Sequence, residues 1–262
     1  MMKQDSKGAY AEVNGLHMYY EIHGKGNPLV LIHGGGSTIE TSFGRIIPHL
    51  AKHRQLIAVE LQAHGHTADR DTPLSFQQDA DDIAKLLENL QITKADFLGF
   101  SNGGQTLIEI ALRHSHIINK IILASIFYKR TAVVPQFWEM FEDATLESMP
   151  KVLQEGYLKA NNNPAGLLNM FNRDVERMKN FVGWTDEVMK TIKAPTLVIN
   201  GNQDVGSMEH AVEISRIMPH AILAVFPGGH GNYIGTIESI ENGNLPKFNA
   251  LDLIEEFLDK AE

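Results

Sequence analysis

The sequence predicts an α/β fold with a mainly parallel sheet of about eight strands and helices on both faces. Strand and helix signals alternate along most of the 262 residues, a pattern typical of parallel sheets covered by helices. Two alternating apolar runs joined by Asn14-Gly15 come first and predict an antiparallel hairpin. Helical periodicity without a convincing strand fills 128–190. We therefore expect a core domain formed by 1–127 and 191–262, with 128–190 inserted as a helical lid.

Short apolar runs and their flanking residues set the order of the elements. Ser75 begins a helix, because Gln78 three residues later completes a capping-box pattern and apolar residues then recur at helical spacing. The other expected helices cover approximately 38–52, 102–114 and 251–262. Buried strands are expected at 28–32, 55–61, 95–100, 120–125, 195–200 and 222–226.

Composition excludes several classes of function. The chain has 23 Lys and Arg residues and 32 Asp and Glu residues, which gives a formal net charge of −9. This charge argues against nucleic acid and anionic membranes as partners. The absence of cysteine excludes disulfides, thiolate nucleophiles and iron–sulfur sites. The sequence begins without a secretory signal, and its apolar runs are only long enough for strands. We expect a cytoplasmic protein that acts on a small molecule; the sequence leaves its oligomeric state open.

A serine between glycines follows the strand at 95–100. Gly99-Phe100-Ser101-Asn102-Gly103 has the form G-x-S-x-G and joins a predicted strand to a predicted helix. A sharp turn there would expose the hydroxyl above the sheet edge, beside the positive end of the following helix. Ser101 is therefore a candidate nucleophile, but a serine hydroxyl needs a base to remove its proton.

Three further motifs follow the ends of other strands. Asp204 lies in NGNQD after the strand at 195–200, and His230 lies in PGGHG after the strand at 222–226. Each is also typical of an ordinary turn, but together they stand where open α/β sheets place their sites. The strand at 28–32 runs into HGGG, so the backbone N–H groups of Gly35 and Asn102 are candidate donors to an oxyanion.

Together, these motifs resemble the α/β-hydrolase superfamily, in particular its lid-containing members with a serine nucleophile, such as esterases and lactonases. The resemblance covers nearly the whole chain. It implies Ser101 as nucleophile, Asp204 as acid, His230 as base and no cofactor. The stretch AVELQAHGHT also resembles a loop of the family, although Ala63 stands where the family has glycine.

The resulting functional hypothesis is a serine hydrolase that cleaves a small, mainly apolar carboxylic ester, thioester or lactone through an acyl-enzyme intermediate. Carbon–carbon bond hydrolysis, cofactor-free perhydrolysis and small-molecule reception on the same fold remain alternatives. A positive side chain facing the pocket would favour the carbon–carbon bond hydrolase, because its substrates usually carry a carboxylate. The candidates in the expected lid are Arg130, Arg173 and Arg177.

The expected lid carries eight of the chain's twenty aromatic residues and five of its ten methionines. This apolar surface exceeds what a short insertion can bury within itself, so we expect part of it to contact substrate. The residues predicted to bind substrate are Phe137, Trp138, Phe141 and Trp184. His33, His64 and His66 could suggest a metal site, but we predict none. The His64-Gly65-His66 sequence lacks the helical or carboxylate context of a zinc site.

Overall fold

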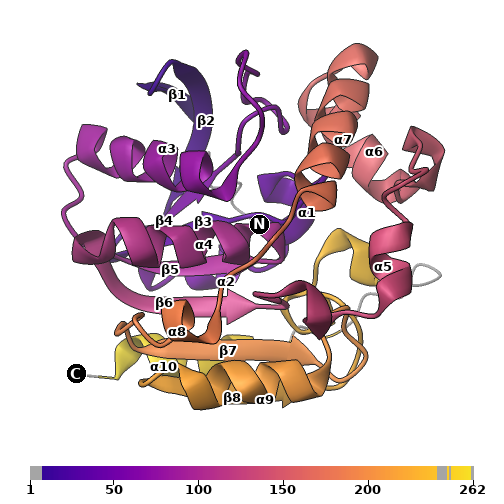
Figure 1. The fold of residues 1–262 in the computed structure, drawn as a ribbon. Helices are drawn as coiled ribbons and strands as arrows, with labels where there is room; N and C mark the ends of the chain where they lie inside the picture. The colour runs from indigo at the N-terminus through magenta and orange to yellow at the C-terminus, as the bar shows by residue number, and fades with distance from the viewer. Residues whose placement is uncertain (1–7, 241–246, 248, 261–262) are drawn as a thin grey trace.

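Eight strands form one sheet in the computed structural model, which describes residues 8–240, 247 and 249–260. The strands lie in the order β1-β2-β4-β3-β5-β6-β7-β8, and the six from β3 to β8 run parallel (Figure 1). This arrangement confirms the predicted fold class. The strands are β1 (Gly8–Val13), β2 (Leu16–His23), β3 (Asn27–Ile32), β4 (Arg54–Val59), β5 (Ala95–Phe100), β6 (Ile118–Ala124), β7 (Thr196–Gly201) and β8 (Ala221–Phe226).

The expected hairpin forms the first edge of the sheet. Val13 pairs with Leu16 across a two-residue turn, so β1 and β2 run antiparallel. Asn14 and Gly15 have φ values of 49° and 79°, the left-handed conformations that this tight turn requires. β2 then pairs antiparallel with β4 and joins the hairpin to the parallel strands.

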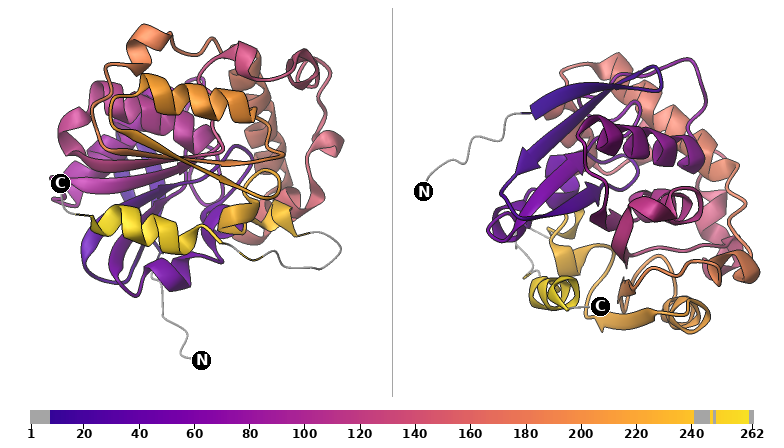
Figure 2. Two further views of the ribbon diagram at one scale, coloured as in Figure 1. Left: turned by 90° about the horizontal axis from the view of Figure 1, so that it is seen from below. Right: turned by 90° about the vertical axis from the view of Figure 1, so that its left-hand side faces the viewer.

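Helices cover both faces of the sheet because the parallel strands are apolar on both sides. Ile121 and Leu123 of β6 contact one core, whereas Ile122 and Ala124 contact the other. Figure 2 shows the two helical layers. The first core packs against α3 (Phe76–Asn89), α4 (Asn102–Arg113) and α9 (Met208–Ile217), and the second against α1 (Ile39–Phe43), α2 (Ile47–Leu50) and α10 (Leu251–Asp259).

Two helix predictions need correction in detail. The single helix expected near 38–52 is two short ones, with Gly44 capping the end of α1 and Pro48 in the first turn of α2. At the start of α3, Ser75 accepts a hydrogen bond from the Gln78 backbone at 3.1 Å as predicted. A complete capping box would also have the Gln78 side chain bonded to the Ser75 backbone N–H. The Gln78 side chain instead donates to Asp82 at 3.0 Å.

Residues 128–190 contain helices and turns between β6 and β7. In Figure 1, α5, α6 and α7 of this segment lie at the carboxyl edge of the sheet, where the strand arrows end, whereas α8 lies nearer the start of β7. Their ends meet: Lys129 and Gly183 form an isolated β-bridge, and the Trp184 backbone donates to the Tyr128 carbonyl at 2.8 Å. The elements are η2 (Arg130–Ala132), α5 (Pro135–Glu139), η3 (Leu146–Ser148), α6 (Lys151–Ala160), α7 (Pro164–Lys179) and α8 (Asp186–Met189).

Short 3-10 turns complete the fold at η1 (Ser115–Ile117), η4 (Asn232–Ile234) and η5 (Ile237–Ser239). The last two follow β8 and lead the chain past the carboxyl edge of the sheet. Within the described ranges, no helix combines the length and apolar character needed to span a bilayer.

Candidate active site

Ser101 occupies a strained turn between β5 and α4. Its φ of 51° and ψ of −124° are unusual for a residue with a side chain, and such strain costs about 1–3 kcal/mol. The flanking glycines make the turn possible by close packing. A Cβ on Gly99 would lie 2.4 Å from the Gly103 carbonyl oxygen, and one on Gly103 would lie 2.1 Å from that of Ile32. The motif glycines therefore hold Ser101 against the sheet edge, as the sequence suggested.

Asp204 and His230 come together although 26 positions separate them in the chain. His230 Nδ1 lies 2.7 Å from Asp204 Oδ1, and the Asp204 side chain has no exposed surface. Burial lowers the pKa of His230, but the hydrogen bond to Asp204 and the Asp204 charge outweigh it and raise the pKa above 6.5. The pair therefore holds the ring with Nδ1–H directed at the carboxylate.

Further hydrogen bonds orient Asp204. Its carboxylate accepts from the backbone N–H groups of Gly201 at 3.0 Å and Val205 at 2.8 Å, and from the Ser125 hydroxyl. Ser125 Oγ also lies 2.6 Å from Tyr233 Oη. Burial raises the pKa of Asp204, but the bonds to His230, Ser125 and Gly201 lower it below its ordinary value. The sequence analysis missed Ser125, whose only signal is its place at the end of β6.

Ser101 and His230 line one cavity of about 310 Å³ at the carboxyl edge of the sheet. The part of the chain that the structure describes shows no hydrogen bond between the Ser101 hydroxyl and the His230 ring; such bonds often tighten only when substrate binds. The wall is mainly apolar. Besides these two residues it comprises Gly35, Gly36, Asn102, Phe127, Phe137, Met140, Phe141, Ala144, Ser148, Met149, Pro150, Leu153, Met170, Phe171, Asp174, Val175, Met178, Val205 and Glu238.

The glycine loop after β3 lies against Ser101 and Asn102. The Gly34 N–H donates to Ser42 Oγ at 3.4 Å and the Gly36 N–H to Asp174 at 2.6 Å. Among the described residues, the N–H groups of Gly35 and Asn102 have no acceptor. A Cβ on Gly35 would lie 2.4 Å from the Asn102 side-chain nitrogen, so the two residues are in direct contact. The two residues predicted from the motifs therefore lie against each other.

A buried ionic cluster, which the sequence analysis did not find, joins α7 to this glycine loop. Asp174 Oδ2 accepts from Gly36 and lies 2.9 Å from His64 Nε2, while Asp174 Oδ1 pairs with Arg177 at 2.5 Å. Arg177 also pairs with Asp79 of α3 at 2.9 Å. We name Asp79, His64, Asp174 and Arg177 the Asp174 cluster. No short motif marks it, because its members are spread along the chain from His64 to Arg177.

Electrostatics within the Asp174 cluster favour an ionised Asp174. Burial raises the pKa of Asp174, but the charges of His64 and Arg177 hold it well below its usual range. Burial lowers the pKa of His64, but Asp174 more than reverses this effect and the pKa is raised. For Asp79, burial outweighs the charge of Arg177 and raises the pKa to about 6. Asp174 is thus the anion on which the cluster is centred.

The histidines of the loops have separate hydrogen-bond partners. His33 Nδ1 donates to the Gly34 carbonyl at 2.7 Å, and its Nε2 accepts from the Leu61 N–H at 3.1 Å. Burial lowers the pKa of His33 to about 3, which keeps this ring neutral. His66 Nδ1 pairs with Glu60 at 2.9 Å. Each ring therefore has a structural role in its loop.

The predicted substrate-binding residues divide into two groups. Phe137 and Phe141 line the cavity, whereas Trp138 and Trp184 are not among its lining residues. The Trp138 ring stacks on Phe181, with centroids 5.7 Å apart. Trp184 donates from its indole nitrogen to Glu109 of α4 at 2.8 Å. Both tryptophans thus pack the insertion against itself and the core, and four methionines (Met140, Met149, Met170 and Met178) line the cavity instead.

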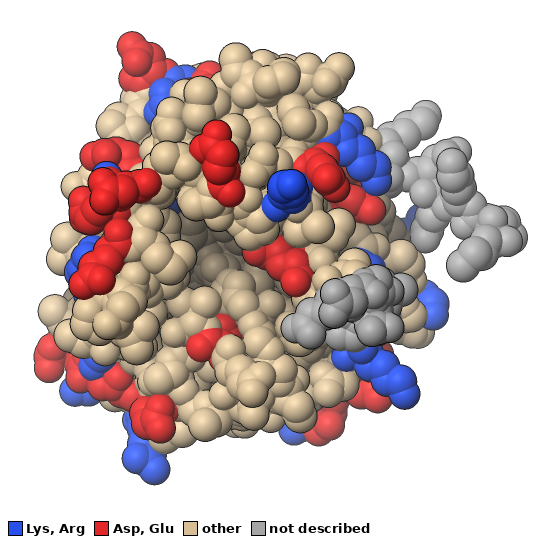
Figure 3. All heavy atoms as spheres, turned by 90° about the vertical axis from the view of Figure 1, so that its right-hand side faces the viewer, with Lys and Arg blue, Asp and Glu red and all other residues tan. Residues whose placement is uncertain are grey.

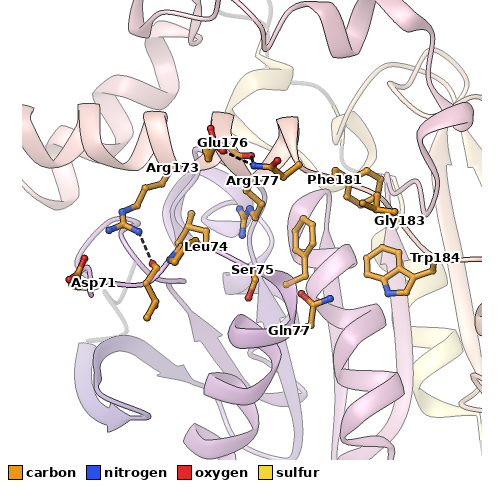
Figure 4. A pocket seen from close by; sticks show the side chains of 15 residues that line it. Asp71, Leu74, Ser75, Gln77, Arg173, Glu176, Arg177, Phe181, Gly183 and Trp184 are labelled. Carbon is orange, nitrogen blue, oxygen red and sulfur yellow. Dashed lines mark hydrogen bonds between the residues drawn. The ribbon is translucent and has the colours of Figure 1, made fainter.

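Trp184 lines a separate surface groove of about 600 Å³ between the start of α3 and the end of α7 (Figure 4). Arg173 and Arg177 line this groove as well. Arg173 donates to the Thr72 carbonyl at 2.7 Å. Arg130 stacks on Trp138, with its guanidinium carbon 4.0 Å from the ring centroid. None of these three arginines lines the cavity beside Ser101.

Comparison with known proteins agrees with this architecture. The family model of the alpha/beta hydrolase fold matches residues 27–173, more than half of the chain. The chain belongs to the alpha/beta hydrolase family. It is similar to an enol-lactonase from Burkholderia xenovorans LB400, with a TM-score of 0.75 and 20% identity over 96% of this chain and 100% of that one. At this level of identity, the likeness shows the shared fold.

Two relatives illustrate the range of the family. The chain is 24% identical to the 2-hydroxy-6-oxo-2,4-heptadienoate hydrolase of Pseudomonas putida over 236 residues, which cover 80% of this chain and 84% of the relative. It is 30% identical to the pyrrolizixenacetamide deacetylase of Xenorhabdus hominickii over 116 residues. That match covers only 44% of each protein.

Proposed function

We propose that this member of the alpha/beta hydrolase family is a serine hydrolase that cleaves a small, mainly apolar ester, thioester or lactone. The observation that carries the proposal is Ser101 in its strained turn, facing one cavity with a His230 ring that Asp204 holds in a single orientation. A nucleophile, a base and a group that orients the base are the parts that two-step acyl transfer requires.

In the proposed mechanism, His230 Nε2 removes the proton from Ser101 as its oxygen attacks the substrate carbonyl. Asp204 stabilises the imidazolium that forms, and the N–H groups of Gly35 and Asn102 stabilise the oxyanion. His230 then gives its proton to the leaving group, and a water molecule that His230 activates releases the acid. Removal of one oxyanion donor costs about 100- to 1000-fold in turnover in other hydrolases. Every step uses groups of the chain, so the mechanism requires no cofactor.

Carbon–carbon bond hydrolysis is the second candidate, and similarity to the P. putida hydrolase favours it. The substrate in that enzyme's name is an oxo-dienoate, which has a carboxylate and no ester. No Lys or Arg is among the described residues that line the cavity here, and the Glu238 carboxylate, which has no ion-pair partner among the described residues, would disfavour such a substrate. We therefore place ester hydrolysis first.

We further propose that 128–190 acts as a lid that selects substrates by shape. In support, thirteen of the residues that line the cavity belong to this segment, and all but Ser148 and Asp174 are apolar. Flexible methionines adapt to ligands of different shape, so the lid should accept a range of acyl groups.

Turnover of p-nitrophenyl butyrate by wild type and Ser101→Ala tests the proposal. The substitution should lower kcat by several orders of magnitude, because triad residues act as a unit. Ser215→Ala in α9 removes a hydroxyl outside the cavity wall and should retain wild-type turnover. If Ser101→Ala keeps more than a few per cent of activity, Ser101 is not the nucleophile. If the wild type cleaves an oxo-dienoate faster than any ester, carbon–carbon bond hydrolysis becomes the preferred function.

A further inference from the structure

The charged groups in the wall of the cavity are all of one sign. Two carboxylates, Asp174 and Glu238, line it, whereas no Lys or Arg in the described part of the chain does so. Figure 3 shows the corresponding face of the molecule, hollowed at its centre, with acidic side chains at the edge of the hollow. His64 and Arg177 compensate the charge of Asp174, so Glu238 is the carboxylate that would favour a positive group over a negative one in the cavity.

The two carboxylates differ in their partners. Asp174 is fully engaged by Gly36, His64 and Arg177. Glu238, in contrast, forms no hydrogen bond or ion pair with any described residue. Burial raises the pKa of the Glu238 carboxyl above its ordinary value, because its apolar surroundings solvate the charge poorly. A cation in the cavity would supply the partner that Glu238 lacks.

The position of Glu238 shows which part of a substrate it would meet. Its carboxylate and the His230 ring line the same cavity, and the Glu238 charge contributes to the raised pKa of His230. In acyl transfer the base returns its proton to the leaving group, so the leaving group lies against His230. Glu238 therefore faces the alcohol or thiol portion of the substrate rather than the acyl portion.

We propose that Glu238 forms a cation subsite for the leaving group, so that the preferred substrates are esters or thioesters whose alcohol or thiol portion carries a positive nitrogen. This inference rests on the proposed hydrolase function and specifies its substrate class. In the reaction, the Ser101 oxygen forms a bond to the acyl carbon, and the bond from that carbon to the leaving oxygen or sulfur breaks. The Ser101 proton passes through His230 to the leaving atom, and one water molecule is consumed on deacylation.

A pair of thioesters that differ only in charge tests the inference. Butyrylthiocholine carries a trimethylammonium group, and S-(3,3-dimethylbutyl) thiobutyrate has a tert-butyl group of the same shape in its place. The thiol released from either can be followed with a colorimetric thiol reagent, because the chain has no cysteine to react with it. The rate measured with Ser101→Ala is subtracted as background. The informative quantity is the ratio of kcat/KM for the cationic thioester to that for the neutral one.

We expect this ratio to be about 10 for the wild type, within the range for a hydrogen-bonded or paired charge that is partly exposed. Glu238→Gln should lower it to about 1, and Glu238→Lys should bring it below 1, since a like charge repels the cation. Both substrates use the same His230, so any change in its pKa cancels in the ratio. Glu155→Gln removes one negative charge from the exposed side of α6 and should keep the wild-type ratio.

Each outcome bears on one of the two proposals. A wild-type ratio near 1, or a high ratio that persists in Glu238→Gln, overturns the cation subsite. A ratio that falls equally in Glu155→Gln assigns the preference to net charge and also overturns it. Ser101-dependent turnover of the neutral thioester with no preference for the cation leaves the hydrolase function standing without the subsite. If the protein cleaves neither thioester and also fails to cleave p-nitrophenyl butyrate, the proposed ester and thioester hydrolase function is itself refuted.

Discussion

Asp174→Asn should lower both the stability and the turnover of the protein. Asparagine keeps the shape of the side chain but removes the charge that Arg177 and His64 face. Removing one partner of a buried ion pair costs about 3–5 kcal/mol. Arg177 retains Asp79 at 2.9 Å, and His64 can lose its proton. We therefore expect the free energy of unfolding to fall by about 3 kcal/mol, near the lower end of that range.

The loss of turnover follows from the bond between Asp174 and the glycine loop. The Gly36 N–H donates to the carboxylate at 2.6 Å, one residue from the Gly35 N–H that we assign to the oxyanion. With a neutral acceptor this bond weakens and the loop is less well fixed. We expect kcat to fall by about tenfold, less than the 100- to 1000-fold for complete loss of an oxyanion donor.

Thermal unfolding and p-nitrophenyl butyrate turnover measure the two effects separately. For a domain of this size a loss of 3 kcal/mol corresponds to a decrease in Tm of about 6–12 °C. Asp143→Asn makes the same change at an exposed position of the 128–190 segment and should alter neither quantity. If Asp174→Asn unfolds at the wild-type temperature with unchanged kcat, the Asp174 cluster neither stabilises the segment nor positions the loop.

Three other predictions concern the triad and the lid. Asp204→Asn should keep the fold and lower turnover about 10,000-fold, as a wrong histidine tautomer does in serine proteases; near-normal turnover would exclude Asp204 as the acid. For a neutral ester, kcat/KM should rise with pH in one step above 6.5, since Asp204 raises the pKa of His230 and only the neutral ring accepts the Ser101 proton; a profile flat from about pH 5 to 9 contradicts this role. Phe137→Ala should change the order of preference among acyl chain lengths, whereas Trp184→Ala should only destabilise the protein, by about 2–3 kcal/mol; identical substrate rankings for both variants would remove shape selection by the lid.

Local patterns in the sequence were sufficient to predict the sheet and the meeting of the main site residues. The turn at Asn14-Gly15, the apolar runs of the strands and the glycines around Ser101 each depend on neighbours within a few positions. Asp204 and His230 lie 26 positions apart, but both follow parallel strands whose carboxyl ends share one edge. The rule that sites gather at this edge brought them together. Their catalytic roles stay predictions.

Side-chain contacts between distant segments were beyond the sequence analysis. Asp174 meets Gly36 across 138 positions, and nothing around Asp174 in the sequence marks it as a buried anion. Composition likewise indicated that the 128–190 segment has apolar surface to bury. It did not indicate which of its residues pack against the core and which line the cavity. Trp184 follows the bridge that closes the segment and so contacts α4, whereas Met170 lies farther along the insertion and reaches the cavity.

The bridge between Lys129 and Gly183 brings the two ends of the 130–182 stretch side by side. Because the two ends lie side by side, a turn of a few residues could replace 130–182 without changing the spacing of β6 and β7. Insertions of different length could then be exchanged between homologous enzymes at this junction, with the sheet and its Asp204–His230 pair left in place. Such an exchange has one constraint: Asp174 and Arg177 of the insertion need their partners His64 and Asp79, which lie in the recipient. A chimera without these partners would leave buried charges unpaired in both the insertion and the core. The residues at the four positions of the Asp174 cluster therefore decide which insertions are compatible with a given core.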